Sequence, residues 1–174
     1  VIVSTIPTGL FFNDHINISI QPNFILVSYK DRYPLWAVYK SHIEQLLNRL
    51  NTLPVIKHYH TIGVRYINGF AGRQLSACTD FAVSLPVDGF NNYFFRAELA
   101  SPPHNIIVQL ADGSSPEGNV VAQIDIDVIR SKLKVPYGAV AQLLEELDAA
   151  HDKVKDTFFG LLNKDFLNSL NPEY

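Results

Sequence analysis

The stretch VVAQIDIDVI at residues 120–129 decides the predicted fold. If it is a strand, Gln123, Asp125 and Asp127 lie on one face and Ile124 and Ile126 on the other, because side chains alternate between the two faces of a sheet. A polar face backed by an apolar face is typical of an antiparallel strand that covers a core on one side only. Similar patterns predict further strands at residues 16–20, 24–27, 59–70, 77–85, 93–99 and 105–110.

Two segments have helical periodicity instead. In residues 35–50, apolar side chains such as Trp36, Tyr39 and Ile43 recur at steps of three and four, which is the pattern of an amphipathic helix with one buried stripe. A longer helix is expected at residues 137–162, with a continuation to residue 170 as the alternative. Short loops separate most of the predicted strands, and short loops favour antiparallel neighbours.

Together these elements predict an α+β fold. We expect a curved antiparallel sheet of about six or seven strands with two helices packed on one face, one of them long and C-terminal. A helix-grip-like arrangement, which encloses a cavity between sheet and helix, fits this order of elements. Residues 1–15 are interpreted as an N-terminal arm or a truncated element, and residues 16–174 as a single α+β domain.

Composition limits the classes of function. The chain has 174 residues, 47% of them hydrophobic, which is enough for a real core. Its net charge of −3 gives no overall basic field, so no nucleic-acid partner is expected. A single cysteine cannot form an intrachain disulfide and fits a reducing compartment. No signal peptide and no apolar run of membrane-spanning length are recognisable, so a cytoplasmic protein without a membrane partner is predicted.

The chain contains no methionine and begins at Val1. We expect either a fragment or a sequence from which the methionines are missing. Because missing residues would shift the numbering of neighbours, spacing is interpreted only within short segments.

Asp125 and Asp127 are the first candidates for a site. On one strand face they would lie about 7 Å apart, a separation that suits a divalent cation or shared acid–base work. The simpler interpretation is the polar face of a half-buried strand. Arg65 is their natural partner, since an unpaired charge in a covered strand is costly. We expect a bidentate ion pair with either aspartate, and a ligand carboxylate or phosphate could take the same place on Arg65.

Three histidines are further candidates. His58 and His60 would share a strand face at a spacing that some metal sites use, although two surface histidines are the simpler interpretation. His151 falls in the apolar stripe of the long helix, which suits a catalytic or pH-sensing group as well as a hydrogen-bonded core histidine. The sequence has no glycine-rich phosphate loop and no known nucleophile or zinc motif. No catalytic residue, metal or cofactor is therefore predicted.

Three segments carry a family resemblance: YPLW at residues 33–36, VRYIN at residues 64–68, and DID at residues 125–127 followed by a helix with His151 and Phe158. With them the chain resembles a sporadically distributed family of uncharacterised prokaryotic proteins that share an L-R-Y-I-N-like strand and a C-terminal helix with an L-H…F pattern. Val64 and Ala150 stand where that family usually has leucine. The matching positions are Trp36, Arg65, Tyr66, Asn68, Asp125, Asp127, His151 and Phe158.

The resemblance implies a shape and a set of positions rather than an activity, and the patchy distribution of the family implies a regulatory or defence-associated setting. The candidate ligand-binding or structural polar cluster is therefore Arg65, Tyr66, Asn68, Asp125, Asp127 and His151.

The leading hypothesis is a non-enzymatic domain that binds a small molecule or a protein. The alternative is a metal-assisted hydrolase or transferase that uses Asp125, Asp127 and one of the histidines. A third hypothesis is a homo-oligomer that pairs through the aromatic-rich strand at residues 91–99.

Overall fold

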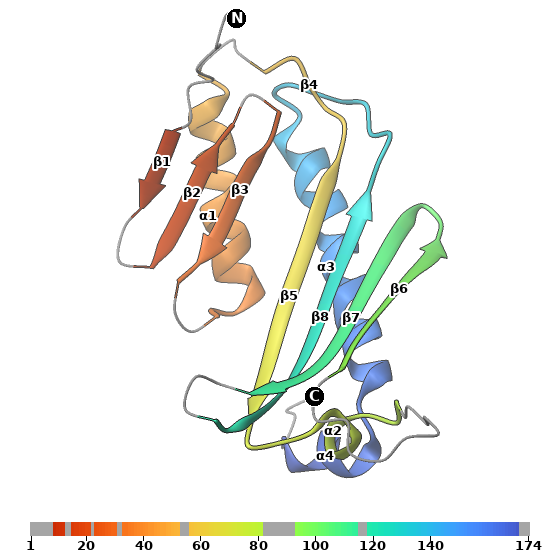
Figure 1. The fold of residues 1–174 in the computed structure, drawn as a ribbon. Helices are drawn as coiled ribbons and strands as arrows, with labels where there is room; N and C mark the ends of the chain where they lie inside the picture. Colours follow the sequence, from red (N-terminus) through yellow and green to blue (C-terminus); the bar gives the residue numbers. More distant parts are fainter. Residues whose placement is uncertain are drawn as a thin grey trace, which may run out of the picture. The chain divides into compact units, whose positions relative to one another are not determined.

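The computed structural model describes residues 9–12, 15–21, 23–30, 33–52, 56–81, 93–114 and 118–170. The chain divides into two compact units, Val1–Pro54 and Val55–Tyr174, and each is described by itself. The first unit contains β1 (Gly9–Phe12), β2 (Ile16–Ile20), β3 (Ile25–Tyr29) and α1 (Trp36–Leu50) (Figure 1).

In the first unit, three antiparallel strands in the order β1-β2-β3 are covered on one face by α1. The Tyr39 hydroxyl of α1 donates to the Val27 carbonyl of β3 at 2.6 Å, and the Tyr29 hydroxyl lies 2.5 Å from His42 Nδ1. Burial, together with the neighbouring Tyr33 and Tyr29, raises the pKa of Tyr39 to about 12. The predicted arm at residues 1–15 includes β1, which pairs with β2.

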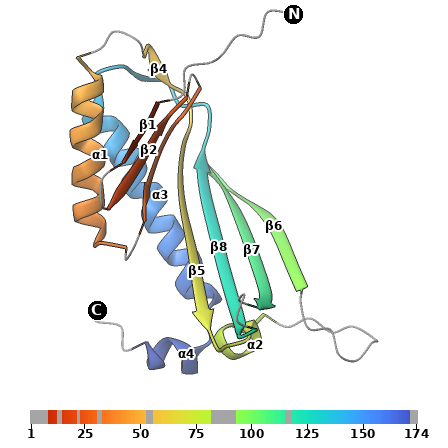
Figure 2. The same cartoon turned by 60° about the vertical axis from the view of Figure 1, so that its left-hand side comes forward.

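The elements of the second unit are β4 (His58–Tyr59), β5 (Ile62–Ala71), α2 (Leu75–Cys78), β6 (Tyr93–Ser101), β7 (His104–Ser114), β8 (Val120–Arg130), β9 (Val135–Pro136), α3 (Val140–Leu161) and α4 (Lys164–Ser169). Four of the strands form an antiparallel sheet in the order β5-β8-β7-β6. The long helix, α3, lies along one face of the sheet against β8 and β5 (Figure 2). A two-stranded ladder of β4 and β9 lies beyond one end of the β5–β8 pair, and α2 and α4 lie near the other end (Figure 1).

The core of the second unit lies between the sheet and α3. Ile124, Ile126 and Val128 of β8 are fully buried, and Ala150 and Val154 of α3 are buried as well. Because β8 alternates, its polar residues lie on the opposite side, which we call the outer face of the sheet. The alternation predicted for residues 123–128 is confirmed.

The α+β class, the antiparallel pairing and the long C-terminal helix are confirmed. The expectation of about six or seven strands in one curved sheet is not confirmed, since the described strands form sheets of three, two and four strands. Alternation identifies the residues of a strand, but it does not specify which strand edges pair. The assignment of residues 16–174 to a single domain stays a prediction beside the division into two units.

The strand predicted at residues 77–85 is wrong at its start. Ala77 and Cys78 belong to the short helix α2, Thr79 forms an isolated bridge with Leu162, and residues 82–85 lie outside the described residues. Asp112 of β7 explains the helix, because its Oδ1 accepts the backbone N–H of Leu75 at 2.7 Å. This long-range cap leaves no local signal in the sequence.

The long C-terminal helix ends at Leu161 and does not continue unbroken to residue 170. Leu162 is extended, with φ −73° and ψ 136°, and α4 begins after Asn163. The Asn163 side chain accepts the backbone N–H of Phe166 at 2.8 Å, which is a favourable N-cap. None of the helices in the described segments combines the length and hydrophobicity that a membrane crossing requires.

Candidate functional site

Arg65 and Asp125 form a bidentate ion pair on the outer face of the four-stranded sheet. Arg65 Nε donates to Asp125 Oδ1 at 2.9 Å, and Nη2 donates to Oδ2 at 2.6 Å. In the register of β5 and β8, Arg65 lies directly opposite Asp127 and diagonal to Asp125. A diagonal neighbour is within reach of a long side chain, so the pair forms with one of the two predicted partners.

Gln109 completes a three-residue network. It lies opposite Asp125 across the β7–β8 pair, and its Nε2 donates to Asp125 Oδ2 at 2.9 Å. The Asp125 side chain is only 3% exposed, whereas the Arg65 side chain is 51% exposed. The carboxylate is therefore buried and satisfied, while the guanidinium is held in a fixed orientation at the surface.

The pKa values of Arg65 and of the neighbouring Asp127 are both shifted. The hydrogen bond to Asp125 raises the pKa of Arg65, although partial burial opposes this. Burial also raises the pKa of Asp127, and Asp125 adds to the rise while Arg65 opposes it. A buried carboxyl beside a second carboxylate is harder to ionise, so Asp127 accepts a proton more readily than a solvated aspartate does.

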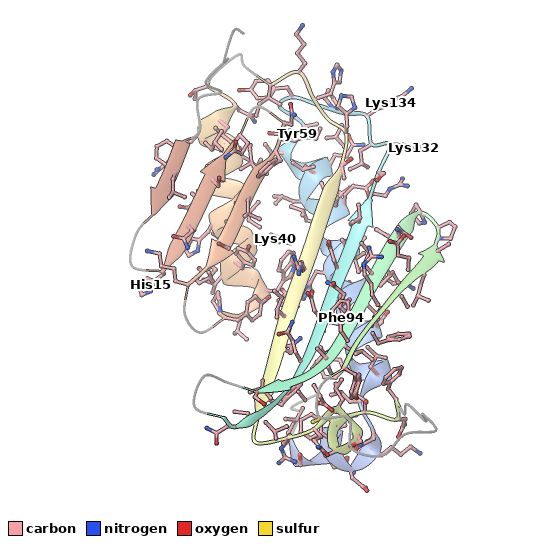
Figure 3. The ribbon with its side chains drawn as sticks, viewed as in Figure 1. His15, Lys40, Tyr59, Phe94, Lys132 and Lys134 are labelled. Carbon is pink, nitrogen blue, oxygen red and sulfur yellow. The ribbon has the colours of Figure 1, made fainter. Side chains whose placement is uncertain are left out.

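Two registered rows of side chains cross the outer face at this network. One row runs Arg96, Gln109, Asp125 and Ile67, and the next runs Glu98, Ile107, Asp127 and Arg65. Arg96 and Glu98 form an exposed ion pair of 2.6 Å. Ile67 of β5 is 58% exposed, and Phe94 (Figure 3), which lies on the outer face of β6, is 63% exposed. The outer face therefore combines oriented charges with accessible apolar side chains.

The predicted polar cluster is divided by the sheet. Arg65, Asp125 and Asp127 lie on the outer face, whereas Tyr66 and Asn68 lie on the face toward α3, because neighbours in a strand alternate. The hydroxyl of Tyr66 is 3.1 Å from His151 Nδ1, and their ring centroids are 5.7 Å apart. His151 is buried, so this part of the predicted cluster is a core hydrogen bond between sheet and helix.

The ligand set required by the metal-assisted alternative does not assemble in the described segments. His151 lies on the other side of the sheet from both aspartates, and the Asp125 carboxylate already accepts three hydrogen bonds. His58 and His60 are exposed, with ring centroids 6.0 Å apart. Across the described residues, no group of three or more histidine, cysteine, aspartate or glutamate side chains is placed to hold a metal ion.

Three residues of the outer face were missed by the sequence analysis: Gln109, Arg96 and Glu98. The only sequence signal is that each is a polar residue inside an otherwise apolar strand, and this signal does not show which residues are opposite one another. Two further positions of the resemblance, Trp36 and Phe158, form aromatic contacts within their own units. Trp36 packs edge-on against Tyr39 in the first unit, and Phe158 packs against Phe159 in α3.

Comparisons of the chain with known protein families, with curated proteins and with solved structures found no match. The resemblance to a prokaryotic family therefore stays a prediction.

His151 is expected to make stability depend on pH. Burial lowers its pKa below the ordinary 6.5, with Asp152 and Asp148 opposing the change and Lys155 adding to it. The unfolded chain then binds the proton more tightly than the folded chain, so the free energy of unfolding decreases as pH falls below 6.5. We expect the urea midpoint of the wild type to fall between neutral pH and pH values near 5.5, and His151→Gln to reduce that fall.

The matched control is His58→Gln, which makes the same substitution at an exposed histidine. His104, whose pKa burial also lowers, contributes a residual slope in every variant. Identical slopes for the wild type and His151→Gln would show that His151 is not kept neutral by the fold.

Proposed function

We propose that the protein is a non-enzymatic interaction domain whose outer sheet face binds a carboxylate-bearing segment of a partner protein. The supporting observation is the surface guanidinium of Arg65, which two hydrogen bonds to the buried Asp125 carboxylate hold in one orientation. Because the side chain is already ordered, it loses less conformational entropy when it binds a partner. Asp125 engages Nε and Nη2, and within the described residues no bond occupies Nη1. A second carboxylate therefore has donors to bind.

The surroundings of Arg65 support a protein partner rather than a small solute. Ile67 and Phe94 provide exposed apolar area on the same face, and binding hot spots typically combine arginine and aromatic side chains. A pocket that encloses a small molecule would need concave walls, and the rows around Arg65 are strand residues on a sheet surface. A protein segment that places an acidic residue on Arg65 and an apolar residue on Ile67 fits this arrangement.

A non-enzymatic role is supported by the distribution of the titratable groups. The candidate acid and base groups, Asp127 and His151, lie on opposite faces of the sheet and cannot act on one substrate atom. The family resemblance supports a prokaryotic regulatory or defence-associated setting.

Selection of displayed random peptides against the wild-type protein tests the proposal. Selected peptides are expected to contain an acidic residue close to an apolar one, and to bind Arg65→Gln about tenfold more weakly, which corresponds to loss of one charge-assisted interaction. Ile67→Ala, which leaves the ion pair intact, should also weaken binding. Lys155→Gln, at an exposed position of α3, is the control for charge alone.

Enrichment of peptides without acidic residues would contradict the proposal. So would peptides that bind Arg65→Gln and Ile67→Ala as tightly as they bind the wild type.

A further inference from the structure

A second, separate surface is formed where β4 and β9 meet. The backbone N–H of Tyr137 donates to the Lys57 carbonyl at 3.0 Å, and that of Leu133 donates to the His60 carbonyl at 2.9 Å. These bonds bring two distant segments, residues 57–60 and 130–137, side by side. Figure 3 shows Lys132 and Lys134 at the end of the sheet where β8 leads toward β9.

Several exposed side chains of this surface are basic. We define the basic patch as Lys57, His58, His60, Lys132 and Lys134, all of which are exposed. No aspartate or glutamate occurs within residues 56–62 or 130–138. The nearby Arg130 is matched by Glu146, with 3.5 Å between Nε and Oε2, so the three lysines carry the unmatched charge of the patch.

The rest of the chain has the opposite charge. The chain has 14 Lys+Arg and 17 Asp+Glu, so without the three patch lysines 11 basic residues face 17 acidic ones. A local field of one sign on a chain of the other sign attracts an oppositely charged partner to one place. The patch is therefore complementary to an anionic segment.

The backbone of Lys132 gives a second, independent observation. Its φ is +59°, and it is the one residue other than glycine with a positive φ in the described part of the chain. A lysine in this left-handed region is strained, and glycine would be favoured there. Strain of this kind is kept where the side chain has a use, and the side chain of Lys132 lies in the basic patch.

We propose that the basic patch binds a short acidic segment of a partner protein. The acidic side chains that flank the patch distinguish this partner from nucleic acid. Glu146 lies beside Arg130, and Glu145 precedes it at an exposed position in the first turns of α3. A nucleic-acid strand carries closely spaced phosphates along its whole length, so it would continue from the patch onto like charges. A short acidic peptide ends within the patch.

Fluorescence anisotropy with a short labelled oligoglutamate peptide tests this at low ionic strength, where exposed charges are least screened. The wild-type protein is expected to bind the peptide and to lose affinity as salt is added. The triple variant Lys57→Gln, Lys132→Gln and Lys134→Gln should bind about tenfold more weakly. The matched control, Lys153→Gln, Lys155→Gln and Lys164→Gln, removes equal charge elsewhere in the same unit and should bind like the wild type.

A single substitution separates binding from folding. Lys132→Gly relieves the positive φ and removes one patch charge, so it should raise the melting temperature and weaken peptide binding together. If Lys132 had a structural role alone, Lys132→Gly would change the melting temperature without weakening peptide binding.

Three outcomes would overturn the inference: no binding of the peptide by the wild type, equal loss in the patch and control variants, or tighter binding of a labelled oligothymidylate of the same charge. The inference does not rest on the proposed function, because the triple patch variant should still bind the selected peptides, which require Arg65 and Ile67 of the outer face.

Discussion

Replacing Arg65 by alanine is expected to lower the free energy of unfolding by about 2–3 kcal/mol. The substitution leaves the Asp125 carboxylate buried with the Gln109 amide as its remaining partner in the network, and a buried carboxylate that loses its counter-charge is destabilising. The effect is smaller than for a fully buried pair because the Arg65 side chain is half exposed and its charge is partly screened. Urea unfolding at neutral pH measures the change.

Arg96→Ala is the matched control on the same face. Arg96 pairs with Glu98, and both side chains are largely exposed, so its loss should cost about 0.5 kcal/mol or less. Arg65→Lys should recover part of the stability, because lysine restores the charge without the two parallel hydrogen bonds. Equal effects of Arg65→Ala and Arg96→Ala would contradict the burial of Asp125 described above.

The second large effect is expected at Ile126 of β8, which is fully buried between the sheet and α3. Ile126→Ala should lower the free energy of unfolding by about 2–5 kcal/mol, because it removes buried methyl groups and leaves a cavity that the core fills only in part.

Ile67→Ala makes the same chemical change on the outer face, where the side chain is 58% exposed, and should cost about 0.5 kcal/mol or less. Chemical denaturation of both variants under one condition gives the comparison. A similar loss for the two isoleucines would mean that the buried and outer faces are assigned incorrectly.

Much of the local structure could be predicted from the sequence. The alternation of Gln123, Asp125 and Asp127 with Ile124 and Ile126 correctly divides β8 between its two faces, because period-two alternation is a direct consequence of strand geometry. The helical spacing in residues 36–50 likewise identifies α1. In both cases a single element carries the whole pattern.

What the sequence did not predict depends on contacts between distant residues. Nothing in the local sequence near Leu75 indicates that Asp112 caps α2, and nothing in the strand patterns separates the first unit's sheet from the second. Which strand edges pair depends on tertiary contacts, and these are not encoded in the alternation of a single strand.

The candidate site shows the same limit. The sequence predicted that Arg65 pairs with Asp125 or Asp127, and the register selects Asp125. Tyr66 and His151 were predicted to lie with these charges, although one step along β5 places Tyr66 on the opposite face. Gln109 was missed because its role arises only from its position opposite Asp125.

A double-mutant cycle of Arg65→Ala and Asp125→Asn tests the central claim most directly. If the guanidinium is held by the buried carboxylate, removing the charge of Asp125 also removes most of the penalty for losing Arg65. The double variant should then be more stable than the sum of the single changes predicts, by at least about 1 kcal/mol in urea unfolding. Strict additivity of the two substitutions would contradict an oriented Arg65 and, with it, the binding face proposed above.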